Sequence, residues 1–169
     1  MKKSEKIMTV MILLFLSAGS LFSQENNEKK WISANSFNVI IPQGDMKDTY
    51  NYGLGIYGSI DYNFSKNLAW RFDLGWNDLE GDEKTVVDTL GNVYTNKPKM
   101  SVWEFTTGFK ASVSIFYIEA RGGYFTGVHE WGIVPAVGLR IGKFDIQGNY
   151  KLVGDNNWFG ARIGYYWGG

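Results

Sequence analysis

Ionisable side chains recur at alternate positions along several segments of this chain. Arg71 and Asp73 are two residues apart, as are Glu119 and Arg121. Because side chains at i and i+2 point to the same face of a β-strand, each pair would place opposite charges side by side. Such charges could form ion pairs or line a path for ions. The ionisable residues that would lie on the same, polar face of their strands are Asp61, Arg71, Asp73, Glu104, Lys110, Glu119, Arg121, Arg140, Asp145, Lys151 and Arg162.

His129 is the only histidine, and it would be the natural general base of any nucleophilic site. It lies in the segment 126–130, which we expect to be a short loop. A serine nucleophile would have to lie beside it, and the sequence has no His-x-Ser arrangement. We therefore expect no catalytic residue and no enzymatic activity.

The sequence also argues against metal, cofactor and nucleic-acid binding. It contains no cysteine, which excludes thiolate metal sites and disulfides. Its 17 basic and 17 acidic residues balance, so no positive field would attract nucleic acid. We interpret the polar segment 78–99 as one long loop, into which the flanking strands could extend and in which 85–87 and 93–95 could form a hairpin that turns at 90–92. The acidic residues of this loop lack the spacing of a calcium loop. They are Asp78, Glu80, Asp82, Glu83 and Asp88.

Strands must position these residues, because apolar and polar side chains alternate along most of the chain. From Phe159 to Trp167 the odd positions are apolar, and the even positions include Gly160, Arg162 and Gly164. Aromatic residues at 17% together with 21 glycines also favour a β architecture. The alternation predicts eight strands, at 31–41, 52–62, 68–77, 103–110, 116–124, 133–142, 144–152 and 156–167.

Side-chain volume indicates which face of these strands points inward. An eight-stranded barrel has an interior just wide enough to be filled by side chains. The polar face carries many glycines, and the apolar face carries the bulk. We therefore expect the apolar face to point outward into lipid, with a lumen filled by paired charges. The expected lipid-facing and interfacial residues include Trp70, Trp76, Trp103, Phe105, Tyr165 and Trp167.

The N-terminal segment 1–23 has the features of a secretory signal peptide. Lys2, Lys3 and Lys6 precede an apolar run over 7–16, which is too short to span a bilayer as a helix. Small residues follow, and we expect cleavage after Ser23, with Ser20 as the alternative. Residues 24–30 would then form a polar lead-in, and 31–169 would form the barrel.

With its tight and long connections in alternation and its aromatic closing strand, the chain resembles the small bacterial outer-membrane β-barrel family of the OmpA and OmpX type. The resemblance covers residues 31–167 and concerns architecture rather than activity. It implies a place in the outer membrane of a Gram-negative cell envelope, contact with outer-membrane lipid and lipopolysaccharide, and insertion by the barrel-assembly machinery. We expect a monomer with no peptidoglycan-binding module after the barrel.

The main functional hypothesis is a non-enzymatic membrane barrel with a structural or interaction role. The long loop 78–99 would be its contact surface. One alternative is a soluble, lipocalin-like barrel that binds an apolar ligand, with Trp70 and Phe105 lining a cavity and with Arg71 and Glu119 in water. Another is a barrel enzyme that modifies lipid A, which would depend on His129.

Overall fold

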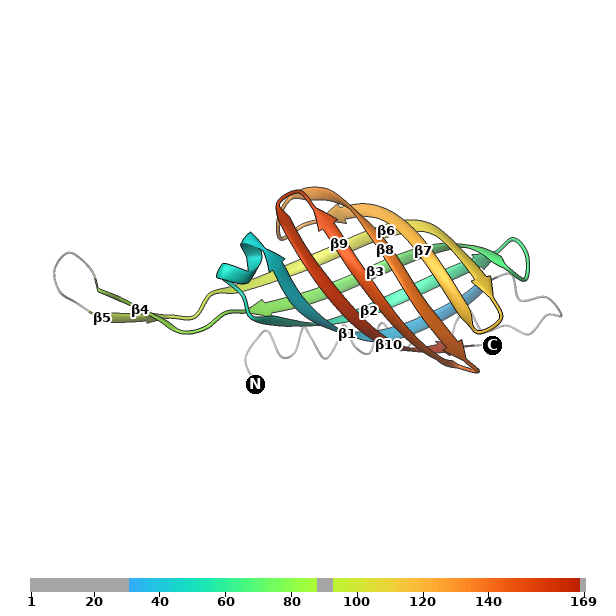
Figure 1. Cartoon of the computed structure of the whole chain (residues 1–169), viewed down its shortest axis with the longest axis horizontal. Helices are drawn as coiled ribbons and strands as arrows, with labels where there is room; N and C mark the ends of the chain where they lie inside the picture. The colour runs from blue at the N-terminus through green and yellow to red at the C-terminus, as the bar shows by residue number, and fades with distance from the viewer. Residues whose placement is uncertain (1–30, 88–92, 168–169) are drawn as a thin grey trace.

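The computed structural model describes residues 31–87 and 93–167 of the chain. Eight strands of these ranges form a closed barrel in which every neighbouring pair is antiparallel (Figure 1). The predicted all-β, eight-stranded antiparallel barrel is therefore confirmed. The expected signal peptide and lead-in lie outside the described residues. The barrel strands are β1 (Trp31–Gly44), β2 (Tyr52–Asn63), β3 (Leu68–Glu80), β6 (Lys99–Val113), β7 (Phe116–Phe125), β8 (Glu130–Ile141), β9 (Phe144–Val153) and β10 (Asn156–Trp167).

The last strand closes the cylinder, as predicted. β10 pairs with β9 on one side and with β1 on the other. Its ladder with β1 runs from Gly44 opposite Asn156 to Ser33 opposite Trp167. Closure leaves no barrel strand with an open edge that could pair with another chain.

The two ends of the barrel differ in their connections. At the end that we call the turn end, short turns join the strands at 64–67, 114–115 and 142–143. The opposite end, the loop end, carries the 3-10 helix η1 (Asp45–Asp48) and the connection 81–98. The connection 154–155 is also tight, with Gly154 at a φ of 56°. No helix within the described ranges has the length and apolar character needed to cross a membrane.

Two connections at the loop end differ from the prediction. The first strand does not end at Ile41 but continues through Pro42 to Gly44. Residues 41–44 pair with β10 and have no partner in β2, and a proline is tolerated in a strand that is paired on one side.

The segment 78–99 contains the hairpin and the strand extensions that the sequence allowed, rather than a single loop. It comprises the end of β3, a hairpin of β4 (Lys84–Val87) and β5 (Val93–Asn96), and the start of β6. β4 and β5 pair with each other and not with the barrel, and Figure 1 shows them projecting beyond its end. The predicted hairpin turn at 90–92 lies outside the described residues.

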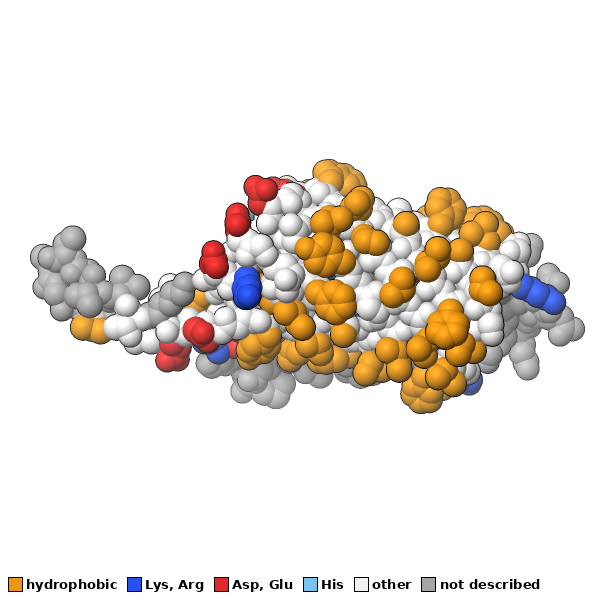
Figure 2. Space-filling view, in the orientation of Figure 1, with side chains coloured by type: hydrophobic (Ala, Val, Ile, Leu, Met, Phe, Trp, Pro, Cys, Tyr) orange, Lys and Arg blue, Asp and Glu red, His pale blue; other side chains and the backbone are white. Residues whose placement is uncertain are grey.

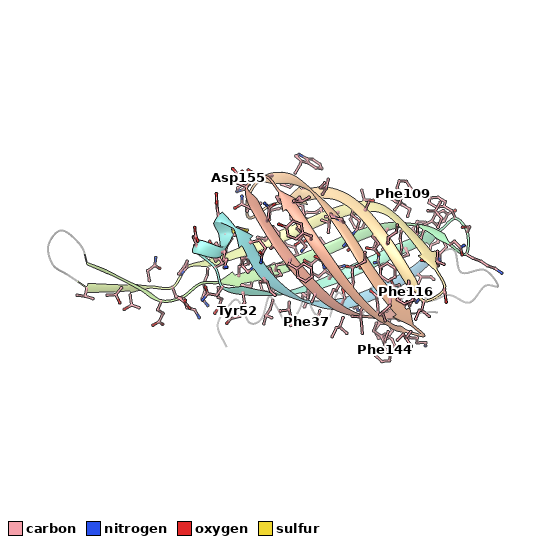
Figure 3. All side chains as sticks on the ribbon, in the orientation of Figure 1. Phe37, Tyr52, Phe109, Phe116, Phe144 and Asp155 are labelled. Atoms are coloured by element: carbon pink, nitrogen blue, oxygen red, sulfur yellow. The ribbon has the colours of Figure 1, made fainter. Side chains whose placement is uncertain are left out.

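Side chains alternate between the two faces of the barrel wall, as the sequence pattern requires. Along β9, for example, buried and more exposed positions alternate over the whole strand. Phe37, Phe109 and Phe144 point away from the barrel (Figure 3). The wall also needs glycine at close contacts, because a Cβ at Gly75 would overlap the Tyr57 ring. The interior is therefore filled, and its contents form the candidate functional site.

Candidate functional site: the filled lumen and its two ends

The lumen has two layers of different chemistry. Polar and charged side chains fill its middle and its turn-end half, and an apolar cluster fills its loop-end part. All of the ionisable residues expected on the inner face are buried except Arg140. The lumen is therefore charged, but charges do not fill all of it.

Arg71 is the centre of the charged layer. Its Nε donates to Oδ1 of Asp61 at 2.7 Å and lies 3.6 Å from Oδ1 of Asp73. Its terminal nitrogens donate to the carboxylate of Glu119 and to the hydroxyl of Tyr166. One guanidinium thus joins β2, β3, β7 and β10 across the barrel.

Asp73 gathers two further arginines. Its Oδ2 accepts a hydrogen bond from Nη1 of Arg162 at 2.7 Å and another from Arg121. Arg121 also lies 3.3 Å from Oε2 of Glu119, which accepts from Nε2 of Gln147 at 2.8 Å. The two ion pairs of Asp73 cross the lumen between strands that are not neighbours in the wall, and each cation of this group has a carboxylate nearby.

A second polar group centres on Glu104, nearer the loop end. Its Oε1 accepts from the amide of Asn77 at 2.6 Å, from the ammonium of Lys151, and lies 2.8 Å from the Tyr57 hydroxyl. Lys151 also donates to the Tyr57 hydroxyl at 2.6 Å. Lys151 is the only cation among these partners, so its removal would leave the buried charge of Glu104 without an ion pair.

Two of the expected network members depart from full pairing. Asp145 is buried, but it accepts from the Tyr117 hydroxyl at 2.9 Å and forms no ion pair with any described residue. Arg140 is not in the lumen but half-buried at the turn-end mouth, where β8 approaches its last residue. The expectation of a lumen filled throughout by paired charges is thus corrected at both of these positions.

The apolar cluster closes the loop end of the lumen. Trp158 is fully buried and meets the ring of Phe125 edge-to-face, with centroids 5.7 Å apart. Met46, from the helix η1, packs on this cluster. The ammonium of Lys151 lies 5.5 Å from the Trp158 ring centroid and so connects the two layers. We call this group the apolar plug; it consists of Ile40, Met46, Leu79, Val102, Phe125, Val134, Val153 and Trp158.

The plug was missed by the sequence reasoning, although the pattern contains a signal for it. Each of three plug residues lies an even number of residues from a charged residue of the inner face, and so on the same face of its strand. Val102 is two residues from Glu104, Val153 two from Lys151, and Trp158 four from Arg162. Apolar residues thus continue the inner face at the loop-end part of these strands, where we expected only polar ones. Tyr166, which anchors Arg71 and Lys110, was on the inner face of the last strand but was not included in the predicted network.

The outer wall carries the aromatic residues that we expected to face lipid. Trp70 and Phe105 are exposed, and Trp76, Trp103, Tyr165 and Trp167 are half-buried because their neighbours cover them. Trp76 and Trp103 are cross-strand partners. The rings of Tyr165 and Trp167 meet edge-to-face at 5.0 Å.

Two ion pairs stabilise the base of the projecting hairpin. Glu80 accepts hydrogen bonds from Lys97 at 2.6 Å and from Lys99 at 2.7 Å. The hydrogen bond to Glu80 raises the pKa of Lys97 above its ordinary value. The Gly81 N–H donates to the Pro98 carbonyl at 2.9 Å. These contacts fix where the hairpin leaves the barrel.

The structure places His129, the residue on which the lipid A-modifying alternative depends, between two strands. It lies in the exposed connection between β7 and β8 with a φ of 58°, and no described hydroxyl or carboxylate is hydrogen-bonded to its ring. The described ranges also hold no group of three or more potential metal ligands.

Comparison with known proteins gives remote matches in structure. No protein-family model matches the sequence, and no curated protein matches it. The crystal structure of Ail, the attachment invasion locus protein of Yersinia pestis, is 13% identical and covers 80% of this chain and 97% of that chain, with a TM-score of 0.49. The structure of Ail in complex with the heparin analogue sucrose octasulfate is 12% identical and covers 81% of this chain and 99% of that chain, with a TM-score of 0.48.

A chain from the de novo design of transmembrane β-barrels is 12% identical and covers 79% of this chain and 94% of that chain, with a TM-score of 0.47. These likenesses are too remote to indicate an activity. The assignment of the barrel rests on the strand pairing described above.

Proposed function

We propose that this protein is an integral outer-membrane barrel with a structural or interaction role. The observation that carries the proposal is the distribution of side chains across the wall. Hydrophobic side chains cover the outer surface of the barrel, and acidic ones gather at the loop end (Figure 2). Arg71, Asp73 and Lys151 are buried inside. Lipid is the solvent that suits an apolar outer wall of this extent, and a closed barrel satisfies its backbone there.

The lipocalin-like alternative requires the opposite arrangement. It predicted that Trp70 and Phe105 would line a cavity, but both are exposed on the outer wall. It also predicted that Arg71 and Glu119 would face water, but both are buried in the ionic network. This geometry contradicts a soluble barrel with an apolar ligand site.

The proposal includes a lumen that does not conduct ions. The apolar plug obstructs the loop end, and the Arg71 and Asp73 groups fill the middle of the cylinder. An eight-stranded barrel leaves no open channel when side chains fill it. Planar-bilayer recordings should therefore show no steady conductance, and a stable open level would contradict a filled lumen.

We also propose that the protein is not an enzyme. No hydrogen bond joins the His129 ring to a hydroxyl or carboxylate of the described residues, and this supports the proposal. The test is substitution of His129 by Ala in the producing cell, with lipid A composition as the measurement. Lipid A should be unchanged, and a change would favour the lipid-modifying alternative.

The hairpin β4–β5 is the surface that we propose for interaction, because it projects beyond the barrel and is paired only with itself. Outer-membrane lipid and lipopolysaccharide would surround the wall. Export through the signal peptide 1–23, insertion by the barrel-assembly machinery and a monomeric state complete the proposal.

Cell fractionation tests the central claim. The protein should fractionate with outer membranes, and it should migrate differently on gels before and after heating, because a folded membrane barrel resists detergent until it is heated. Recovery in the soluble periplasmic fraction would contradict the proposal.

A further inference from the structure

The turn end of the barrel holds a cavity that plays no part in the proposed function. Its volume is about 160 Å³, and it lies between the β2–β3 and β6–β7 turns. Three cationic side chains line it, and they come from three separate parts of the chain: Lys66 from the β2–β3 turn, Lys110 from β6 and Arg140 from β8. Asp61 supplies its one lining carboxylate.

That carboxylate is already shared by buried cations. Oδ1 of Asp61 accepts from Nε of Arg71 at 2.7 Å. Oδ2 lies 3.4 Å from the second Arg71 nitrogen and 3.4 Å from the ammonium of Lys110. Glu119 shares these cations, since its Oε1 lies 3.9 Å from the ammonium of Lys110. Asp61 and Glu119 are thus paired with Arg71 and Lys110, and among the described residues the unpaired positive charge of the cavity comes from Lys66 and Arg140.

Arg140 is held in place without a counter-ion. Its guanidinium stacks over the Tyr166 ring at 4.0 Å from the centroid, and its Nε donates to the Gly142 carbonyl at 3.3 Å. Asp145 faces it across the β8–β9 ladder but forms no ion pair with it. In the described part of the chain, neither Arg140 nor Lys66 lies within 4.0 Å of a carboxylate oxygen.

We propose that this cavity binds a phosphate-class oxyanion. The guanidinium of Arg140 offers two terminal nitrogens in the planar arrangement that binds phosphate, and stacking on Tyr166 orients it in advance. Lys110 lines the cavity beside it as a hydrogen-bond donor, and its ammonium, already paired with Asp61, is fixed by donating to the Tyr166 hydroxyl at 2.7 Å. Lys66 approaches from the exposed turn. The cavity has room for a tetrahedral oxyanion and a few waters, each of which takes about 30 Å³.

The oxyanion could be free phosphate or the headgroup of a phospholipid. Leu68, Ile115 and Phe116 also line the cavity, and all three are exposed hydrophobic residues at the rim of the wall. A lipid headgroup at this rim and a free phosphate from the aqueous side would present the same chemistry to Arg140.

The experiment is a nuclear magnetic resonance titration of the protein refolded in a maltoside detergent, which contains no phosphate. In one arm inorganic phosphate is added, and in the other the micelles receive phosphatidylglycerol. We expect saturable shifts of the backbone amides in residues 63–68 and 112–117. Arg140→Gln should raise the Kd by about tenfold or more, because a charge-assisted hydrogen bond is lost. Lys66→Gln should raise it by a smaller factor, about threefold, because the side chain is exposed.

Lys143→Gln is the matched control, since Lys143 is an exposed cation of the neighbouring β8–β9 turn that does not line the cavity. Its Kd should equal that of the parent protein. Shifts in only one arm identify the source of the oxyanion and support the proposal. It is overturned by the absence of saturable shifts in both arms, by an unchanged Kd in Arg140→Gln, or by an equal loss in Lys143→Gln. If Arg140→Gln does not refold, Lys66→Gln decides: an unchanged Kd there overturns the proposal.

Discussion

Glu104 shows how a single buried charge depends on its partners. Lys151 and Asn77 donate to it, and the Tyr57 hydroxyl lies at hydrogen-bond distance. Both Glu104 and Lys151 are almost completely buried. Burial of either charge alone would be costly, so the two residues act as a unit rather than as independent contributors.

Replacement of Lys151 by Met should therefore lower the free energy of unfolding by about 3–5 kcal/mol, because Glu104 is left without its cation. The double variant Lys151→Met/Glu104→Gln should regain most of this loss, since a neutral amide still has Asn77 and Tyr57 as partners. Urea unfolding of the barrel in lipid vesicles measures both. The exposed Lys143→Met is the control, with a change within about 0.5 kcal/mol. A double variant as unstable as the single one would contradict this coupling.

Trp158 allows the apolar plug to be tested separately from the charges. Trp158→Ala should lower the free energy of unfolding by about 3–5 kcal/mol, because it opens a cavity beside Phe125. Trp131→Ala removes the same side chain from the outer wall, where it is 76% exposed, and should cost less. The same vesicle unfolding assay compares them. Equal losses would mean that Trp158 does not pack as a core residue.

At the scale of the element, the hairpin β4–β5 is structurally independent of the barrel. Replacement of residues 84–96 by a Gly-Gly turn keeps Glu80, Gly81 and Pro98 at the base. We expect a change in the free energy of unfolding below about 1 kcal/mol, because loop closure varies by only about 0.6 kcal/mol for each doubling of loop length. Heat-modifiable migration and urea unfolding are the measurements.

Deletion of residues 165–169 is the contrasting change. It removes the ladder pairs of Tyr165, Tyr166 and Trp167 with β1, together with the Tyr166 hydroxyl that Arg71 and Lys110 contact. This truncation should prevent assembly, whereas the hairpin deletion should not. A truncated chain that inserts normally would show that closure of the barrel does not need the end of β10.

The elements also show what the sequence could and could not predict. Strict alternation from Leu68 to Asn77 assigns each of these β3 residues to one face of the strand. The same alternation in the other segments predicted the number of barrel strands, and the glycines of the polar face predicted which face points inward. The hairpin did not follow from the alternation alone, because its two short strands pair only with each other and not with the barrel. The plug was missed because its residues lie singly at the ends of several strands, and their contact exists only once the barrel closes. Arg140 lies on the face of β8 that points into the lumen, but it is the second-last residue of the strand and therefore lies at the mouth of the barrel.

For the whole molecule, charged side chains lie inside the barrel and large apolar side chains lie outside, which is the reverse of a soluble protein. The buried acidic and basic residues of the lumen, except Asp145, form ion pairs with one another, and the outer wall presents apolar side chains around the cylinder. The two ends are also different, since the apolar plug closes the loop end and a cationic cavity opens at the turn end. The two ends of the barrel therefore differ: the hairpin β4–β5 projects from the loop end, and the cationic cavity opens at the turn end.

Charge placed on the outer wall distinguishes lipid from water as the solvent of the whole barrel. Val137 is in the middle of β8 and 62% exposed, and Ile141 is equally exposed, at 60%, but ends the same strand. In a bilayer, Val137→Arg should lower the free energy of unfolding by about 2–4 kcal/mol, and Ile141→Arg by less than about 1 kcal/mol, because the cost of a charge falls from the midplane to the interface. In water, each substitution would change the free energy of unfolding by no more than about 0.5 kcal/mol. Unfolding in vesicles measures the difference, and equal small effects at both positions would show that the wall does not face hydrocarbon.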